Sequence, residues 1–250
     1  ALADGEFLVY IQPKYWVGTR ALAGGEALVR WKSPDQGFLS PGEFIPLFEK
    51  NRFIVKLDQF MFTSVCGLLR QWLDAGIEPR PLSVNVSRMQ FHTPDFVERY
   101  IRIKSQYAIP DGLLELEFTE SIFFDNVALL SSAVHELRRA GIKCSIDDFG
   151  AGYSSLNVLK ALPVSVLKLD GMFFRTAKDD EQAKIVIRNI MRMAGELKMA
   201  TVAEGVETHE QVAFLETTGC DIIQGYVFAR PMPAAEFTEL LAGEGGHAER

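Results

Sequence analysis

The sequence predicts an α/β fold, a single (β/α)8 barrel of the TIM type. Strand patterns and helix patterns alternate about seven or eight times along the chain, which is typical of parallel β/α architecture. The 250 residues and the hydrophobic content of 48% are sufficient for one large core. Polar residues also follow many of the expected strands. In a closed barrel these strand ends meet at one mouth, whereas an open doubly wound sheet would spread them along an edge, so the barrel is favoured.

The expected strands are short apolar runs, alternating or continuous, that are bounded by turn residues. These runs are residues 6–12, 26–31, 81–86, 113–118, 142–146, 164–169, 199–203 and 221–226. A loop through residues 15–19 is expected to join the first two strands.

The expected helices lie between these strands, where apolar residues recur at helical spacing. They follow Ser40, span residues 55–75 and 94–107, follow Asp125, end at Leu162, follow Asp180, and span residues 209–217 and 234–241. Ser40, Pro41 and Glu43 have the order expected of a helix start, with a serine cap, a proline at the first position and a glutamate at the third.

Composition narrows the possible partners. The formal net charge of −7 disfavours a nucleic-acid polymer or an anionic membrane as partner of this domain, but it permits a small phosphorylated ligand held through metal ions. Cys66, Cys144 and Cys220 lie far apart and form no C-x-x-C pair, so we expect buried thiols in a reducing compartment. No apolar run approaches membrane-spanning length.

The ends of the chain suggest an excised domain, because the sequence begins at Ala1 without methionine. We expect one domain over residues 1–242 and a flexible tail over residues 243–250. The expected location is the cytoplasm, although the larger parent protein could be anchored in a membrane.

The most informative stretch is Asp147-Asp148-Phe149-Gly150-Ala151-Gly152, which follows the strand at residues 142–146. Two adjacent carboxylates repel each other unless a cation lies between them or one is protonated. A solvated turn with Asp148 as a helix cap is the simpler interpretation of this motif alone. A dinucleotide-binding loop is excluded, since the third glycine is missing and the acids would repel a pyrophosphate.

A metal site is favoured over a solvated turn because polar residues also follow other expected strands. The polar residues expected to converge at the mouth are Glu26, Asn85, Glu117, Asp147, Asp148, Glu204 and Lys168. Oxygen ligands without paired histidine or cysteine indicate Mg²⁺ or Mn²⁺ rather than zinc, and so many carboxylates can hold two ions. Two such ions suit phosphoester hydrolysis, and a buried Lys168 could position the attacking water or take part in proton transfer. Ordinary capping acids at the strand ends are the alternative.

Motifs along the chain resemble, in order, those of the EAL domain family of bacterial cyclic di-GMP phosphodiesterases. They are Gly25-Glu26-Ala27-Leu28-Val29-Arg30-Trp31, Ser83-Val84-Asn85-Val86-Ser87, Leu114-Glu115-Leu116-Glu117-Phe118-Thr119-Glu120-Ser121, Asp147-Asp148-Phe149-Gly150-Ala151-Gly152-Tyr153-Ser154-Ser155, Leu167-Lys168-Leu169-Asp170, Val202-Ala203-Glu204-Gly205-Val206-Glu207-Thr208 and Gln224-Gly225-Tyr226. The resemblance covers residues 7–241 and implies the EAL-domain variant of the barrel.

The resemblance implies metal-dependent cleavage of cyclic di-GMP to linear 5′-pGpG, which lowers a bacterial second messenger. It also implies residue roles. Catalysis would involve Glu26, Lys168 and Glu204. One ion would be held by Glu26, Asn85, Glu117 and Asp147, and the second by Asp147, Asp148 and Glu204. Substrate would contact Gln12, Leu28, Arg30, Asp148 and Gln224. Glu120 and Glu207 would support the side of the site at Lys168 and the central loop, which spans residues 149–156.

Partners follow from the same resemblance. We expect cyclic di-GMP as substrate, regulatory domains in the parent protein, and a homodimer formed through the segment after Asp148. Leu156 and Leu159 would lie on the dimer helix, or else simply cover the barrel.

Departures from the family pattern are few. Ala151 stands where threonine is common, and the first loop, with Lys14-Tyr15-Trp16, is bulkier than usual, which would alter ligand access.

Other functions stay open. A receptor that binds cyclic di-GMP without cleaving it would not need Lys168 or Asp148. A barrel enzyme with another phosphorylated or enolisable substrate is a further alternative, which the motifs disfavour.

Overall fold

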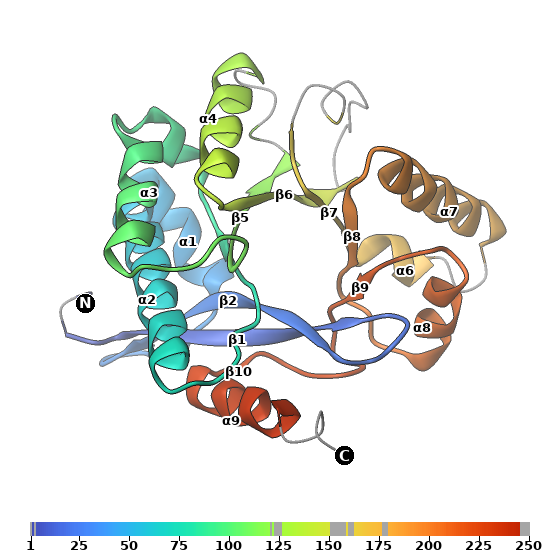
Figure 1. Ribbon diagram of the computed structural model, residues 1–250, viewed down its shortest axis with the longest axis horizontal. Helices are drawn as coiled ribbons and strands as arrows, with labels where there is room; N and C mark the ends of the chain where they lie inside the picture. The colour runs from blue at the N-terminus through green and yellow to red at the C-terminus, as the bar shows by residue number, and fades with distance from the viewer. Residues whose placement is uncertain are drawn as a thin grey trace.

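The computed structural model describes residues 2, 4–120, 122, 127–150, 159, 163–176 and 180–245. Within them, one ten-stranded sheet runs in the order β10-β1-β9-β8-β7-β6-β5-β4-β2-β3, and an additional pairing of β1 with β2 closes it. Because β10 and β3 only flank the closed part, eight strands form the barrel, with helices around its outside (Figure 1). The predicted barrel is confirmed.

The strands are mostly short. They are β1 (Phe7–Trp16), β2 (Leu22–Ser33), β3 (Gly37–Leu39), β4 (Leu82–Asn85), β5 (Leu114–Thr119), β6 (Lys143–Phe149), β7 (Val166–Leu169), β8 (Ala200–Ala203), β9 (Ile222–Ile223) and β10 (Met232–Pro233). From β2 through β9 the neighbouring barrel strands are parallel, so their carboxyl ends share one mouth.

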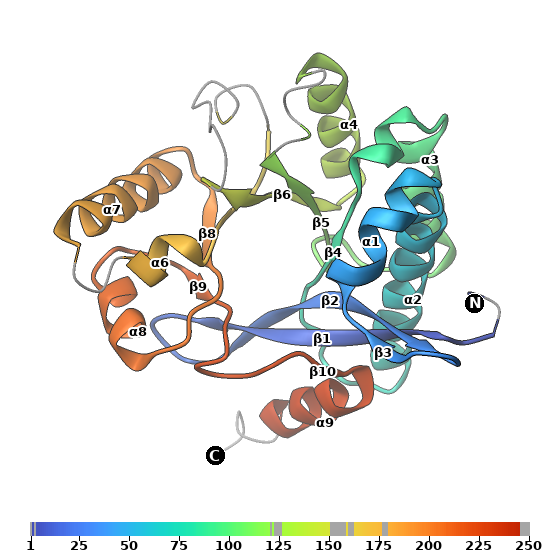
Figure 2. The ribbon, with the colours of Figure 1, turned by 180° about the vertical axis from the view of Figure 1, so that it is seen from behind.

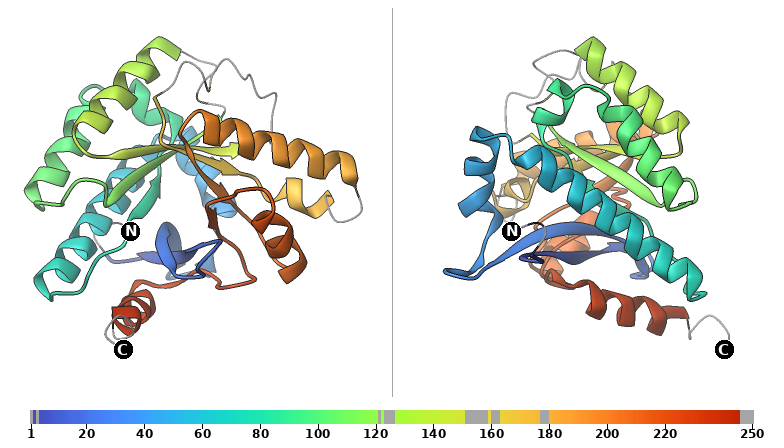
Figure 3. Two further views of the ribbon diagram at one scale, coloured as in Figure 1. Left: turned by 45° about the vertical axis from the view of Figure 1, so that its right-hand side comes forward. Right: turned by 90° about the vertical axis from the view of Figure 1, so that its left-hand side faces the viewer.

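The helices surround this sheet. They are α1 (Pro41–Lys50), α2 (Ile54–Asp74), the short 3-10 helix η1 (Arg88–His92), α3 (Phe96–Gln106), α4 (Val127–Arg139), α6 (Met172–Thr176), α7 (Glu181–Glu196), α8 (His209–Glu216) and α9 (Ala234–Gly245). Seen from behind, α1 lies in front of α2 (Figure 2). Both views of Figure 3 show α9 beneath the β1–β2 ribbon.

Local signals placed several helix ends correctly. The backbone N–H of Ser40 donates to the Glu43 carboxylate at 2.7 Å, as expected for a capping box. The Asp180 carboxylate accepts from the N–H groups of Gln182 and Ala183 at 2.9 and 3.2 Å, which confirms the cap of α7. Along α2, the predicted apolar face is buried.

The first strand is where the sequence-based expectation fails most clearly. Residues 15–19 were expected to form a loop, but β1 continues to Trp16 and pairs antiparallel with β2 from Phe7 onward, so only residues 17–19 form the turn. On the partner strand β2, Gly24 and Gly25 let other backbone and side-chain atoms come close. A Cβ on Gly24 would lie 2.4 Å from the Pro81 carbonyl oxygen, and one on Gly25 would lie 2.5 Å from Ile11 Cγ2. β1 thus runs antiparallel to its two neighbours in the barrel, β2 and β9.

Other boundaries differ by a few residues. β6 runs through the acidic pair to Phe149, whereas the strand was expected to end at residue 146. The last barrel strand is only Ile222–Ile223, shorter than the expected residues 221–226. Helix α9 continues to Gly245, into the segment expected to be a tail.

Several expectations concern residues outside the described part of the chain: the Asp125 cap, the helix end at Leu162, the departure at Ala151 and the dimer residue Leu156. Leu159 is described, and it is buried in this chain's own core. That burial favours the interpretation in which Leu159 covers the barrel.

The three cysteines are buried free thiols, as expected. Among the described helices, none combines the length and the apolar character that crossing a membrane requires.

Candidate active site

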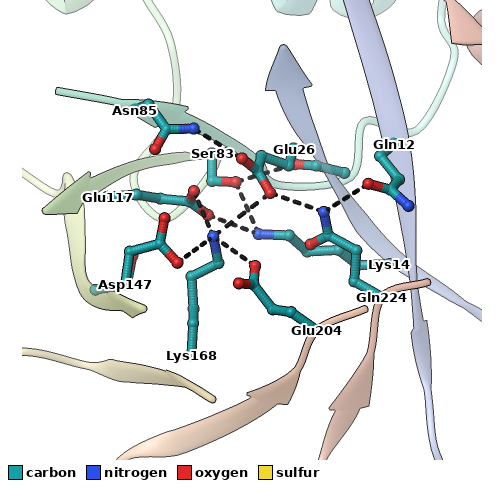
Figure 4. A network of polar contacts seen from close by, with 12 residues as sticks. Gln12, Lys14, Glu26, Ser83, Asn85, Glu117, Asp147, Lys168, Glu204 and Gln224 are labelled. Carbon is teal, nitrogen blue, oxygen red and sulfur yellow. Dashed lines mark hydrogen bonds and ion pairs between the residues drawn. The ribbon is translucent and has the colours of Figure 1, made fainter. Parts of the chain in front are cut away.

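The barrel brings most of the predicted site residues to one mouth. Glu26 lies on β2, Asn85 on β4, Glu117 on β5, Asp147 on β6 and Lys168 on β7, while Glu204 and Gln224 directly follow β8 and β9. These side chains lie together because alternate residues of a barrel strand point inward. Figure 4 shows them converging from separate strands.

Lys168 occupies the centre of this cluster. Its Nζ lies 2.6 Å from Glu117, 2.7 Å from Glu204, 2.9 Å from Asp147 and 3.4 Å from Glu26, and the residue is fully buried. Burial alone would lower the pKa of Lys168, but the surrounding carboxylates together raise it well above its ordinary value. Lys168 is therefore a buried cation held by acids from four strands.

A series of hydrogen bonds leads from Glu26, one of the acids beside Lys168, toward β1. The Asn85 side-chain amide donates to Glu26 at 2.7 Å. Gln224 Nε2 donates both to Glu26 Oε2 at 2.7 Å and to Gln12 Oε1 at 3.1 Å. Two residues predicted to bind substrate, Gln12 and Gln224, are thus joined to the carboxylate of Glu26.

The acids are crowded. Burial raises the pKa of Glu26 and raises that of Glu204 well above its usual range, and neighbouring carboxylates add to both shifts. Burial, followed by repulsion from Asp147 and Asp170, raises the pKa of Asp148 to about 6. Such a cluster attracts cations, because positive charge relieves the repulsion.

The donor atoms also fit a divalent ion. One carboxylate oxygen from each of Asp147, Asp148 and Glu204 lies within 4.8 Å of the others. The whole set offers carboxylate and amide oxygens, which suit hard cations such as Mg²⁺ and Mn²⁺. The residues present therefore fit the expected Mg²⁺ or Mn²⁺ ions.

Asp148 adopts an unusual backbone conformation, with φ of 54°, and its N–H donates to Asp147 Oδ1 at 3.0 Å. A non-glycine residue in this left-handed region is costly, and such residues cluster at functional sites. The conformation allows two consecutive aspartates to reach one cluster.

Asp170 is a neighbour of the site that the sequence motifs place two residues after Lys168 without assigning it a role. In the described part of the chain, Lys168 pairs with four other acids, and the Asp170 carboxyl lies within hydrogen-bonding reach of Asp148 instead. Its spacing of two residues from Lys168 was the available signal.

The two supporting glutamates are placed differently. Glu120 is buried, and its Oε2 accepts from the N–H of Gly150 at 3.2 Å, at the start of the central loop. Glu207 is exposed, and its backbone N–H donates to Gln211. Among the described residues, no side-chain contact joins Glu207 to the cluster.

Leu28 and Arg30 lie further along β2. Leu28 lines a cavity of about 390 Å³ together with residues of α1, α2 and β4, including Asn85 at the edge of the acidic cluster. Arg30 donates to the Val29 carbonyl at 2.9 Å, and its guanidinium lies 5.5 Å from the centre of the Tyr10 ring. A hollow of this size beside the mouth can receive a flat ring system.

Lys14 is a further site residue that the sequence reasoning missed. It was assigned to a loop that alters access, but it lies on β1 with its side chain inside the barrel. Its Nζ lies 2.7 Å from Ser83 Oγ and 2.9 Å from Glu117 Oε1. The signal was its spacing of two from Gln12, which places both residues on the same face of a strand.

Together, the fold and this geometry define a barrel domain with a carboxylate-rich mouth around one central lysine. Residues 1–231 match the EAL domain family. The chain belongs to that family.

Two relatives from Pseudomonas aeruginosa illustrate the similarity. The chain is 38% identical over 238 residues to the cyclic di-GMP phosphodiesterase PA2567, covering 95% of this chain and 40% of that protein. It is 35% identical to the bifunctional diguanylate cyclase/cyclic di-GMP phosphodiesterase MucR, covering 97% of this chain and 35% of that protein. The chain thus spans less than half the length of either relative.

The fold agrees closely with a solved structure, that of the PaMucR phosphodiesterase in complex with c-di-GMP. The two chains superpose with a TM-score of 0.89 at 36% sequence identity, covering 95% of this chain and 96% of the other.

Proposed function

We propose that this domain is a metal-dependent phosphodiesterase that hydrolyses cyclic di-GMP to linear 5′-pGpG. The observation that carries the proposal is the complete set of oxygen donors around Lys168 at one barrel mouth. The similarity of this chain to a phosphodiesterase whose structure was solved in complex with c-di-GMP supports the same substrate.

The donor residues divide into two groups around Asp147. Glu26, Asn85, Glu117 and Asp147 would hold one divalent ion, and Asp147, Asp148 and Glu204 a second, with Mg²⁺ or Mn²⁺ as the ion. Bound ions of this kind lower the pKa of water and neutralise charge on a leaving oxygen.

Lys168 contributes as a fixed donor. Four carboxylates surround its ammonium, so it keeps its protons and orients the attacking water. The same carboxylates are the acceptors available for the proton that this water releases. The water oxygen bonds to phosphorus, the bond from phosphorus to the 3′ oxygen breaks, and that oxygen takes a proton, which leaves 5′-pGpG.

Substrate contacts are assigned to the rim of the mouth. Gln12 and Gln224 lie beside Glu26, and Leu28 lines the adjacent cavity, which would receive one guanine. Arg30, two residues beyond Leu28, would pair with a phosphate, and Asp148 would contact the substrate next to the ions. Glu120 would hold the start of the central loop, and Glu207 would support the same region.

The wider setting is also part of the proposal. Residues 1–242 would form a catalytic module of a larger cytoplasmic or membrane-anchored protein with regulatory domains, since the curated relatives are much longer. A homodimer would form through the segment after Asp148. Sedimentation velocity would test this assembly, and a monomer that is fully active at high dilution would contradict it.

The direct test is incubation of the purified domain with cyclic di-GMP and Mn²⁺ or Mg²⁺, followed by chromatography of the products. We expect pGpG with either ion and none in excess chelator. Tight binding of intact cyclic di-GMP without cleavage would show a receptor instead, and undiminished cleavage in chelator would refute metal dependence.

A further inference from the structure

A second lysine lies inside the barrel, below the mouth. Lys14 is 6% exposed and belongs to β1, where it pairs with Gly24, two residues further from the mouth than the pair formed by Gln12 and Glu26. Taking a lysine out of water is costly unless its charge is paired and its protons are hydrogen-bonded. A charge kept at this position therefore needs strong local partners.

The partners of Lys14 are few and well defined. Its Nζ reaches Glu117 Oε1 at 2.9 Å and Ser83 Oγ at 2.7 Å. The Ser83 hydroxyl in turn lies 3.4 Å from the Gly25 carbonyl oxygen. Lys14 is thereby tied to β4 and β5 at once, and its ammonium is held in one place.

The two oxygens of Glu117 are divided between the two buried lysines. Oε1 faces Lys14, while Oε2 lies 2.6 Å from Lys168 in the middle of the acidic cluster. A carboxylate held at one oxygen can rotate little, so its other oxygen stays directed at the cluster.

We propose that Lys14 is a positioning residue that holds the Glu117 carboxylate with Oε2 directed into the ion-binding mouth. This inference rests on the proposed function, because it assigns Glu117 to a metal ion. It concerns the lower side of the site, whereas Lys168 acts at its centre.

The competing role for Lys14 is that of a simple counter-charge. The two roles predict opposite effects on cation binding. Removing a cation from an acidic cluster should strengthen binding of Mn²⁺ by Coulomb attraction alone. Losing the orientation of a ligand should weaken it, and residues that hydrogen-bond a metal ligand typically contribute about 10–100-fold to metal affinity.

The test is direct Mn²⁺ binding without substrate, measured from the electron paramagnetic resonance signal of free Mn²⁺. The four proteins are the wild type, Lys14→Met, Glu117→Gln and the double variant. We expect Lys14→Met to weaken Mn²⁺ binding about 10–100-fold. In the Glu117→Gln background, the same change should have no further effect, since Lys14 acts through Glu117.

Two further variants distinguish a specific effect on Mn²⁺ binding from a general loss of folding. Lys14→Gln keeps an N–H donor for Glu117 without the charge, so its Mn²⁺ affinity should stay closer to wild type than that of Lys14→Met. Lys104→Met is the matched control, because Lys104 is also a buried lysine paired to an acid. Its partner Asp111 lies just before the start of β5, at the end of that strand away from the mouth. The Mn²⁺ affinity of Lys104→Met should be that of the wild type.

Several results would overturn the inference. One is unchanged or tighter Mn²⁺ binding by Lys14→Met, or by Lys14→Gln if only that variant folds. Another is that the loss of Lys14 weakens Mn²⁺ binding equally in the wild-type and the Glu117→Gln backgrounds. A third is that Lys104→Met weakens Mn²⁺ binding as much as Lys14→Met does. If the wild type cleaves cyclic di-GMP and binds Mn²⁺, such a result contradicts only the role proposed for Lys14. A wild type that neither binds Mn²⁺ nor cleaves substrate would sink the proposed function as well.

Discussion

At the scale of single residues, the mouth balances charge within a very small volume. Lys168 is fully buried, and four acids lie within 3.4 Å of its Nζ. Replacing one member of such a set leaves the others buried and unpaired, which is costly. Stability and catalysis are therefore linked at this residue, and a test has to separate them.

Lys168→Met provides that separation. The variant should still bind cyclic di-GMP in its folded fraction, but the chemical step should slow about 10²–10³-fold, as when one positioned electrostatic contact is removed. Single-turnover kinetics on protein shown to be folded by circular dichroism would measure this. A folded variant with near-normal kcat would show that Lys168 is only structural.

Asp58 offers a test of stability away from the acidic cluster. Its carboxylate accepts from the N–H of Ser87 at 3.0 Å and from Gln90 Nε2 at 3.1 Å, and burial raises its pKa to about 7. A carboxyl whose pKa is raised on folding stabilises the fold while it is protonated. That contribution is complete below about pH 4 and is lost as the pH rises through about 7.

The wild type should therefore lose about 3 kcal/mol of unfolding free energy between pH 5 and pH 8 through this one group. Asp58→Asn keeps an acceptor but cannot ionise, so its stability should fall less over the same interval. Urea denaturation at both pH values measures the difference. Parallel pH profiles for the two proteins would contradict the assignment.

At the scale of elements, β1 does more than begin the barrel. It pairs with β2, β9 and β10, and it contributes Gln12 and Lys14 to the interior. The sequence indicated a shorter strand because the signal for an antiparallel partner lies in another segment. The close approach of other atoms to Gly24 and Gly25 of β2 is likewise not revealed by any local pattern in the sequence.

Gly24→Ala tests that close approach. The added Cβ would lie 2.4 Å from the Pro81 carbonyl oxygen, which is backbone and can move little. We expect a loss of about 1–3 kcal/mol in the free energy of unfolding, as is typical of overpacking. Gly18→Ala is the control on the same hairpin, because nothing lies within 4 Å of its Cβ position. Equal stability of the two variants would count against the packing account.

At the scale of the whole molecule, the barrel converts sequence order into a site. Residues from Glu26 to Gln224 meet only because parallel strands expose their carboxyl ends at one mouth. That rule made the acidic set predictable, since each member lies at the end or on the inner face of an apolar strand. It could not predict which acids pair, because those choices depend on distances between strands.

The missed features have the same cause. The position of Asp170 beside Asp148 depends on a left-handed residue within β6, and the place of Lys14 depends on the antiparallel direction of β1. The exposed position of Glu207 likewise depends on where α8 begins. None of these is encoded in hydrophobic periodicity.

The proposed function requires that the carboxylates at this mouth hold the ions with which the domain hydrolyses cyclic di-GMP. Glu26→Ala removes a carboxylate that Asn85, Lys168 and Gln224 all contact, while leaving the apolar core intact. The decisive measurement is the initial rate of pGpG formation with Mn²⁺ by the wild type and by folded Glu26→Ala. We predict steady product from the wild type and a rate at least about 10²-fold lower from the variant. Equal rates, or no pGpG from the wild type at all, would contradict the claim.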